Sequence, residues 1–333
     1  MEFESELAQL TEPIGPEASC GESLEDTPTL AAFDAYRLFG QLTAPQNEPD
    51  WRELRSASLA ALARSKDLRV LAHLAAAAAH SGKLADALQV FPLIEQWLER
   101  YWDEVYPRID SDAIMRKNAI SDFADRMAVI DGLRRLPLVT HPQLGSFSLR
   151  DIDIISGAQA NPDKDTQPRS QSELDAALKN ADARPLAQLS SLAAKARASL
   201  AATQEIMRVR GGSAGSTPQL EALSAQLARL QQIIGPRLAE SAASETQTPM
   251  TDGDASSGSS EVLAVGAVKS RQDAIRALDA VAGYFRRHEP SSPVALIIER
   301  AKRMVSMDFL EVIAELAPDA LDQARRAAGV RDE

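Results

Sequence analysis

The chain has 333 residues, of which 44% are hydrophobic and 25% charged, as in ordinary soluble globular proteins. This length allows two or three domains with at least one sizeable core. The formal net charge of −12 argues against nucleic acid or an anionic membrane as a partner, because phosphate groups repel such a chain.

The sequence shows no pattern typical of a signal peptide or of a membrane-spanning helix. The acidic start, MEFESELAQL, lacks the basic-then-apolar layout of a signal peptide. No apolar run reaches the roughly 18 residues that a membrane-spanning helix needs. The single cysteine, Cys20, cannot form an internal disulfide. We therefore expect a cytoplasmic protein without direct membrane insertion.

Helical spacing dominates residues 1–155, which predicts an N-terminal helical domain. Asp50 has the type of an N-cap for a helix that begins at Trp51, with Glu53 placed for a capping box. The next helix is expected to end at His80-Ser-Gly-Lys83. Three apolar stripes predict buried faces: Leu68, Leu71, Ala75 and Ala78; Phe91, Ile94, Leu98, Tyr101 and Val105; and Ile120, Phe123, Met127 and Ile130.

Prolines and glycines divide the rest of this region. Pro92 either kinks the helix that carries it or begins its second half, and Pro107 is expected to end that helix. The stretch LPLVTHPQLGSFSLRDIDI is short, β-prone and broken by Pro and Gly, so it predicts a small hairpin. Residues 156–171 contain no large apolar residue and predict a linker.

Residues 172–240 predict an antiparallel helical hairpin. Two heptad-like seams are joined by RGGSAGS, and Gly235-Pro236 is expected to close the second helix. The one polar member of the seams is Thr203. The seam positions are Leu189, Ala193, Ala196, Leu200, Thr203 and Met207, and then Leu220, Leu223, Leu227, Leu230 and Ile234.

The last two segments differ in composition. Residues 241–265 are mostly rich in Gly, Ser and Thr and predict a disordered linker. Residues 266–333 predict a small helical bundle, which makes the whole chain all-α apart from the hairpin. Its second helix carries an apolar stripe of Val294, Ile297, Ile298, Ala301 and Val305.

The stretch HEPSSP before this helix predicts a corner between two helices. Ser292 supplies an N-cap oxygen, and Pro293 lacks the N–H that would be unsatisfied in the first turn. The alternatives for this stretch are a phosphorylation site and a bound anion.

Patterns that resemble catalytic or metal sites lack the context that such sites need. The G-x-S-x-G match around Ser213 follows a helix, whereas an esterase elbow follows a strand. His73 and His80 lie seven residues apart with no neighbouring Cys and no H-E-x-x-H pattern. Cys20 has the type of a structural thiol, and His141 and His288 imply no partner. We therefore expect neither an enzyme nor a catalytic, cofactor or metal site.

Several stretches resemble a known family. EPIGPEASCGESLEDTPTLAAFD is similar to the opening of the ImpA N-terminal domain, and DWRELRSASLAALARSKDLRVLAHLAAA and LERYWDEVYPRID resemble its central signature. The terminal SRQDAIRALDAVAGYFRRHEPSSPVALIIERAKRMVSMDFLEVIAEL resembles the C-terminal domain of short-form TssA proteins of type VI secretion. The positions that carry the resemblance are Trp51, Lys66, Asp67, Leu68, Arg69, Tyr101, Trp102, Asp103, Pro107 and Asp110, and then Glu289, Pro290, Ser291, Ser292 and Pro293.

The resemblance implies a non-enzymatic assembly or baseplate component. Proteins of this family form homo-oligomeric rings through their C-terminal domains and contact baseplate, inner-tube and contractile-sheath proteins. It implies a cytoplasmic location with recruitment to the apparatus at the inner membrane. The alternative is a monomeric helical adaptor or regulatory protein, since SGKLADALQVF is similar to part of a tetratricopeptide unit, although no second copy follows.

The C-terminal bundle offers an oligomer interface. It carries more apolar positions than a unit of this size hides, and Leu296 and Leu310 each lie about 100° around the helix from a stripe residue. We expect these two leucines to face a neighbouring copy.

Overall fold

The structure is a computed structural model that describes residues 2–41, 48–109, 112–160, 169–212 and 214–245, together with helical residues near the C-terminus. The chain forms two units, Met1–Met250 and Thr251–Glu333. In the second unit the described residues are Ile275, Leu278, Val281, Ala282, Phe285, Arg286 and 294–304.

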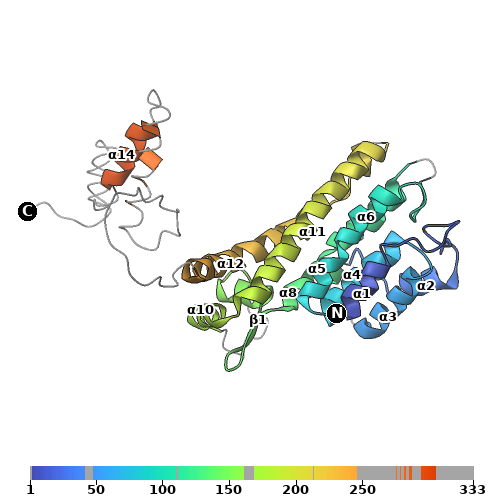
Figure 1. Cartoon of the computed structure of the whole chain (residues 1–333), viewed down its shortest axis with the longest axis horizontal. Coiled ribbons are helices and arrows are strands. Elements are labelled where there is room, and N and C mark those ends of the chain that lie inside the picture. Colours follow the sequence, from blue (N-terminus) through green and yellow to red (C-terminus); the bar gives the residue numbers. More distant parts are fainter. Residues whose placement is uncertain are drawn as a thin grey trace, which may run out of the picture. The chain divides into compact units, whose positions relative to one another are not determined.

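The fold is mainly α, as the sequence predicts, with one two-stranded antiparallel sheet among the described residues. Figure 1 shows the long helix α11 with α12 on one side and α5 and α6 on the other. The elements of this unit are α1 (Glu2–Gln9), α2 (Pro28–Asp34), α3 (Trp51–Leu62), α4 (Leu68–Ser81), α5 (Leu84–Val90), α6 (Pro92–Arg100), α7 (Ile114–Ser121), η1 (Asp122–Ala124), η2 (Arg126–Ile130), α8 (Asp131–Arg135), β1 (Pro137–His141), β2 (Gly145–Ser148), α9 (Leu149–Ile155), α10 (Gln171–Asn180), α11 (Ala183–Arg210), η3 (Ala214–Ser216) and α12 (Glu221–Glu245).

Helix α4 is the centre of the first unit. Its sequence predicts one buried stripe, but it is buried on nearly every face, with α3, α5, α7 and α8 packed around it. Five consecutive alanines, residues 75–79, are fully buried, and their small side chains let the neighbouring helices approach closely. Asp67 caps its start, and Gly82 caps its end within the stretch that the sequence predicts as its stop.

The segment after α4 divides at Pro92, which occupies the first turn of α6. The prediction that this helix continues to Pro107 is wrong. It ends at Arg100, because Tyr101 leaves helical angles and its N–H bonds to the carbonyl of Trp97. The chain then makes turns through residues 102–105. The side chain of Trp97 is fully buried.

The predicted helix through Ile120 and Ile130 is also wrong as a continuous element. Asp125 adopts an extended backbone and caps η2 with its own carboxylate, which accepts from the N–H groups of Met127 and Ala128. The segment therefore forms α7, η1, η2 and α8 in turn, because an aspartate competes for backbone donors that a helix would otherwise use.

The predicted hairpin is confirmed as β1 and β2, with Val139 paired to Phe147 and His141 to Gly145. The residues after Phe147 do not continue as a strand. Ser148 and Asp151 form a reciprocal capping box that begins α9.

The predicted helical hairpin is formed by α11 and α12, and all eleven predicted seam residues are buried. The expectation that Gly235-Pro236 ends the second helix is wrong, since Pro236 lies inside α12, which continues to Glu245. Beyond the proline, Leu238 packs against the core and Arg237 donates to the carbonyl of Ala181 at 3.2 Å. These contacts oppose the cost of a proline in a helix. Helix α11 also packs along α5 and α6 (Figure 1).

In the second unit, the described part consists of isolated helical positions and α14 (Val294–Met304). Ala282 is buried, and Arg286 pairs with Glu299 of α14. Ile297 is 64% exposed, which differs from its expected place in a buried stripe. Val305 lies outside the described residues.

Candidate functional site

The signature residues Lys66 to Arg69 lie where the chain enters α4. Asp67 is fully buried and accepts the backbone N–H of Arg69 at 2.9 Å, so it is the N-cap of the central helix. The Arg69 guanidinium donates two hydrogen bonds to the same carboxylate, from Nε at 3.0 Å and from Nη2 at 2.8 Å. Leu68 is fully buried beside them. A carboxylate at a helix N-terminus is stabilised by the helix dipole as well as by these bonds.

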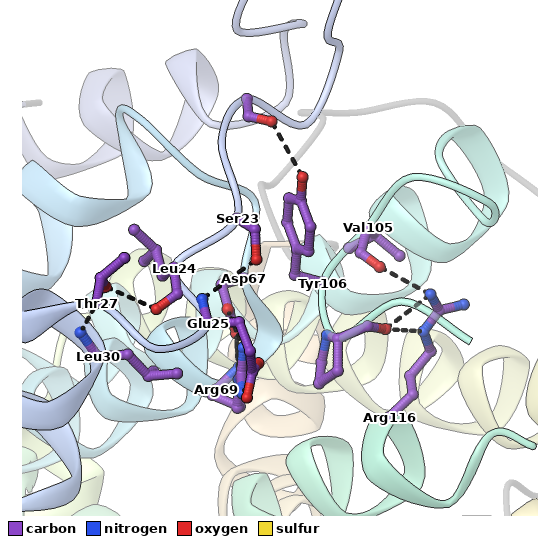
Figure 2. A network of polar contacts seen from close by, with 12 residues as sticks. Ser23, Leu24, Glu25, Thr27, Leu30, Asp67, Arg69, Val105, Tyr106 and Arg116 are labelled. Carbon is purple, nitrogen blue, oxygen red and sulfur yellow. Dashed lines mark hydrogen bonds and ion pairs between the residues drawn. The ribbon is translucent and has the colours of Figure 1, made fainter. Parts of the chain in front are cut away.

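Arg69 also ties the N-terminal segment to this helix start. Its Nη1 donates to Glu25 at 2.7 Å, close to the turn that begins α2 (Figure 2). Burial alone would lower the pKa of Arg69, but the hydrogen bonds and charges of Asp67 and Glu25 outweigh burial and raise it. Its charge is therefore fixed at every pH that the fold survives.

Lys66 is fully buried and donates from Nζ to the carbonyl of Leu10 at 2.6 Å. Trp97 donates from Nε1 to the same carbonyl at 2.9 Å. Burial lowers the pKa of Lys66 to about 8. The rings of Trp97 and Tyr101, 5.2 and 5.3 Å from Nζ, favour the charged form. Lys66 therefore carries its proton at neutral pH.

Backbone bonds join three separate segments around Lys66. Its N–H donates to Cys20 at 2.9 Å and its carbonyl accepts from Tyr106 at 3.0 Å, while Leu68 donates to the Tyr106 carbonyl at 2.9 Å. The Tyr106 hydroxyl donates to the Gly21 carbonyl at 3.3 Å (Figure 2). The N-terminal loop, the start of α4 and the loop after α6 are thereby held as one body.

The loop after α6 is fastened by Arg116 of α7, which the sequence reasoning missed. This arginine is 1% exposed and donates to the carbonyl of Trp102 at 2.9 Å. It also donates to the carbonyls of Val105 and Pro107 at 2.7 to 3.1 Å (Figure 2). Burial lowers its pKa to about 10. Carbonyl acceptors leave no mark in a sequence, and residues 113–120 hold two adjacent basic residues, Arg116 and Lys117, with nothing to show which one is buried.

Trp102 lies between two arginines. Its ring centroid is 4.8 Å from the guanidinium carbon of Arg116 and 4.5 Å from that of Arg210, at the end of α11. The signature tryptophan thus joins the N-terminal bundle to the helical hairpin. Its neighbour Asp103 is exposed.

Trp51, the remaining described signature residue of the N-terminal part, lies at another place. Its ring stacks on His80 with the centroids 4.0 Å apart and an interplanar angle of 9°. The His80 Nε2 lies 3.1 Å from the carbonyl of Ala128, and burial lowers the pKa of this histidine. The pair fixes the start of α3 against the end of α4.

Lys66, Asp67 and Arg69 are bound by groups of the same chain, so these charged signature residues hold chain segments in place. The other candidate reactive residues are Cys20 and His73. Burial and then the charge of Glu104 raise the pKa of Cys20 to about 11, which keeps it a thiol. His73 Nδ1 lies 2.9 Å from the Arg69 carbonyl. Among the described residues no cluster of His, Cys, Asp or Glu could hold a metal ion.

Some residues of the signature, of the predicted oligomer interface and of the rejected catalytic and metal patterns fall outside the residues that the structure describes. They are Asp110, Ser213, His288, Glu289, Pro290, Ser291, Ser292, Pro293 and Leu310. The segment before Ser213 is the 28-residue helix α11 and no strand, so the context of an esterase elbow is absent there. Leu296 is 76% exposed, and its place in an oligomer interface stays a prediction.

Comparison with known proteins places this arrangement in a family. Residues 11–129 match the family model described as ImpA, N-terminal, type VI secretion system. That match spans Cys20, the Lys66–Arg69 signature and the Arg116 loop. The whole chain is 29% identical to the type VI secretion system component TssA1 of Pseudomonas aeruginosa, over 96% of this chain and 97% of that protein.

The chain is thus similar to a TssA protein along nearly its whole length, and its residues 11–129 match the ImpA N-terminal domain. A solved N-terminal domain of the TssA component from Burkholderia cenocepacia, which includes the conserved ImpA_N region, has the same fold, with a TM-score of 0.55 and 22% identity. The likeness covers 70% of this chain and 94% of that domain. In the part of the chain that the structure describes, no helix is long and apolar enough to cross a membrane.

Proposed function

We propose that this chain is a non-enzymatic assembly component of a type VI secretion system, built to oligomerise through its C-terminal residues and to coordinate tail-tube and sheath assembly from the cytoplasm. The supporting observation is the similarity to TssA1 along nearly the full length of both chains. The coarser role, a type VI secretion component, is supported by this similarity together with the ImpA N-terminal match of residues 11–129.

The N-terminal unit fits a scaffold. Its buried charged residues bind carbonyl groups and carboxylates of the same chain, and they fasten loops that would otherwise move. A rigid body of this kind can present surfaces to baseplate, inner-tube and sheath proteins, and several copies on a ring would add avidity. The proposed partners are these tail proteins and further copies of the chain.

Helix α14 carries exposed apolar side chains that favour self-association. Leu296 and Ile297 are 76% and 64% exposed in the single chain, next to each other on one helix. Residues 266–333 form a short segment, and segments of this size are marginally stable as isolated units. Contacts between copies would bury both side chains, and head-to-tail contacts of one kind close into rings.

The test is the mass of the full-length protein in solution, measured by analytical ultracentrifugation at micromolar concentration. We expect an oligomer, which Leu296→Glu breaks while the far-UV circular dichroism stays unchanged, because an unpaired charge would be buried at the contact. Leu310→Glu is expected to act in the same way.

Val209→Glu is the matched control, since Val209 is an equally apolar residue of α11 with 63% exposure in the other unit. It should leave the mass unchanged. In cells that lack the native chain, Leu296→Glu should also abolish sheath assembly, scored with a fluorescent sheath protein. A wild-type monomer would instead favour the monomeric adaptor.

A further inference from the structure

A groove on the first unit lies between η2 and α8 on one side and the first turns of α12 on the other. The turn after α9 contributes a third wall. We name it the Arg126 groove, after the exposed arginine at its edge. Its lining includes Arg126, Met127, Arg134, Asp153, Ala225 and Arg229. None of these is a signature residue.

The charge of the groove is positive, in a chain whose net charge is −12. At its floor Asp153 is 4% exposed, and it receives Arg134 Nη2 on one oxygen at 2.6 Å and Arg229 on the other. Two guanidinium groups therefore share one carboxylate, and one positive charge is left over. Asp131 of the same lining is paired with Arg135.

Arg126 adds a second surplus charge. Its side chain is exposed and has no hydrogen bond or ion pair with any residue that the structure describes. The Arg229 side chain keeps 35% exposure while bound to Asp153. A carboxylate entering the groove would meet both guanidinium groups, with little burial cost for the outer one.

The remaining lining suits a polypeptide. Met127 and the 6%-exposed Ile130 give an apolar strip, and Ala158, Ala222 and Ala225 at the rim leave room for a main chain to approach. Two buried polar atoms, Arg134 Nε and Gln226 Oε1, have no hydrogen-bond partner among the residues that the structure describes. One is a donor and the other an acceptor, so a ligand that both accepts and donates could satisfy them after small side-chain shifts. A peptide group does both, whereas a fully ionised phosphate only accepts.

We propose that the Arg126 groove binds an acidic, partly apolar segment of a partner protein. Its carboxylates pair with Arg126 and Arg229, and its apolar side chains cover Met127. The proposal goes beyond the assembly role and does not rest on oligomerisation, because the groove lies wholly within the first unit.

The test uses full-length protein and a fluorescein-labelled synthetic peptide of glutamate, alanine and leucine, with a lysine-for-glutamate copy as the opposite-charge probe. Fluorescence anisotropy should show binding of the glutamate peptide only, weakening as salt rises. Arg126→Glu should lower its affinity about tenfold or more, the equivalent of one lost ion pair and one new repulsion. Because Arg126 is exposed and unpaired among the described residues, this variant should fold normally.

Arg184→Glu is the matched control, since Arg184 is an exposed arginine at the start of α11, near the other end of the helical hairpin. Its binding should equal that of the wild type. Equal binding of both peptides, or unchanged binding by Arg126→Glu, would overturn the proposal. A different outcome is that inorganic pyrophosphate or a short single-stranded RNA displaces the peptide and fails to bind the Arg126→Glu variant. That result would assign the groove to phosphate ligands and would also overturn the proposal.

Discussion

At the scale of single residues, the carbonyl of Leu10 allows the contributions of Lys66 and Trp97 to stability to be compared. It accepts from both Lys66 Nζ and Trp97 Nε1. A buried ammonium must lose its water, and that loss offsets most of what its contacts contribute. A buried indole loses far less and fills much more volume. The two donors to one carbonyl should therefore differ sharply in how much they stabilise the fold.

Lys66→Met should change the free energy of unfolding by no more than about 1.5 kcal/mol, because methionine has a similar length and Leu10 keeps its tryptophan donor. Trp97→Ala should cost about 3–5 kcal/mol, as other large aromatic truncations in cores do. Urea unfolding at neutral pH, followed by far-UV circular dichroism, measures both. Equal losses in the two variants would mean that the buried charge itself holds the N-terminal segment.

Asp122 predicts a pH dependence. Burial, followed by the charge of Asp125, raises its pKa from 3.8 to about 7. The folded state thus keeps a proton that the unfolded chain has already released, and the stability linked to it is full below pH 3.8 and lost as the pH rises to about 7. Asp122→Asn should melt a few degrees above wild type at about pH 8, and the difference should shrink towards about pH 5.

The exposed Asp34 on α2 provides the control for this titration. Asp34→Asn should shift the melting temperature by the same small amount at both pH values. An advantage of Asp122→Asn that is constant with pH would place the pKa of Asp122 outside this window.

At the scale of elements, the periodicity of the sequence predicted those features that depend on contacts between residues close in the chain. The leucine spacing of α12 gave its buried seam, and the β-prone run gave β1 and β2. The break at Asp125 was beyond it, because the second carboxylate oxygen of Asp125 accepts the N–H of Gly40, 85 residues away, at 2.8 Å. The capping box of Ser148 and Asp151 could be recognised in the sequence, but the β-prone residues around it led to the prediction of a hairpin alone. Signature positions came from resemblance, while their carbonyl partners, such as Leu10, leave no sequence signal.

The α11–α12 hairpin carries an element-scale prediction at Thr203. Its side chain is fully buried, and Oγ1 has no hydrogen-bond partner among the described residues. Thr203→Val keeps the shape and removes the unsatisfied hydroxyl, so it should stabilise the chain by about 1 kcal/mol. Leu200→Ala in the same seam should destabilise it by about 2–5 kcal/mol. Thermal melts distinguish the two signs, and a loss on Thr203→Val would show that the hydroxyl is bonded in solution.

At the scale of the whole molecule, the packing of α11 along α5 and α6 bears on how the chain is divided. The composition of residues 156–171 and 241–265 marks two linkers of similar appearance. The first lies between elements that are joined by contacts elsewhere: α11 with α6, Arg210 with Trp102, and Arg229 with Asp153. Two linkers that look alike in sequence should therefore behave differently when they are cut.

Brief digestion of the full-length chain with proteinase K should test this difference. We expect cuts within 246–261 and 161–168 before any cut in α3 to α6, because the sequences of those stretches contain no Val, Ile, Leu or aromatic residue. On size-exclusion chromatography the pieces on either side of 161–168 should elute together, held by the buried α11 contacts. The fragment beyond 261 should elute separately from both. Elution of the α10–α12 piece apart from residues 1–160 would contradict the packing described here. An early cut inside α4 would contradict its place at the centre of the fold.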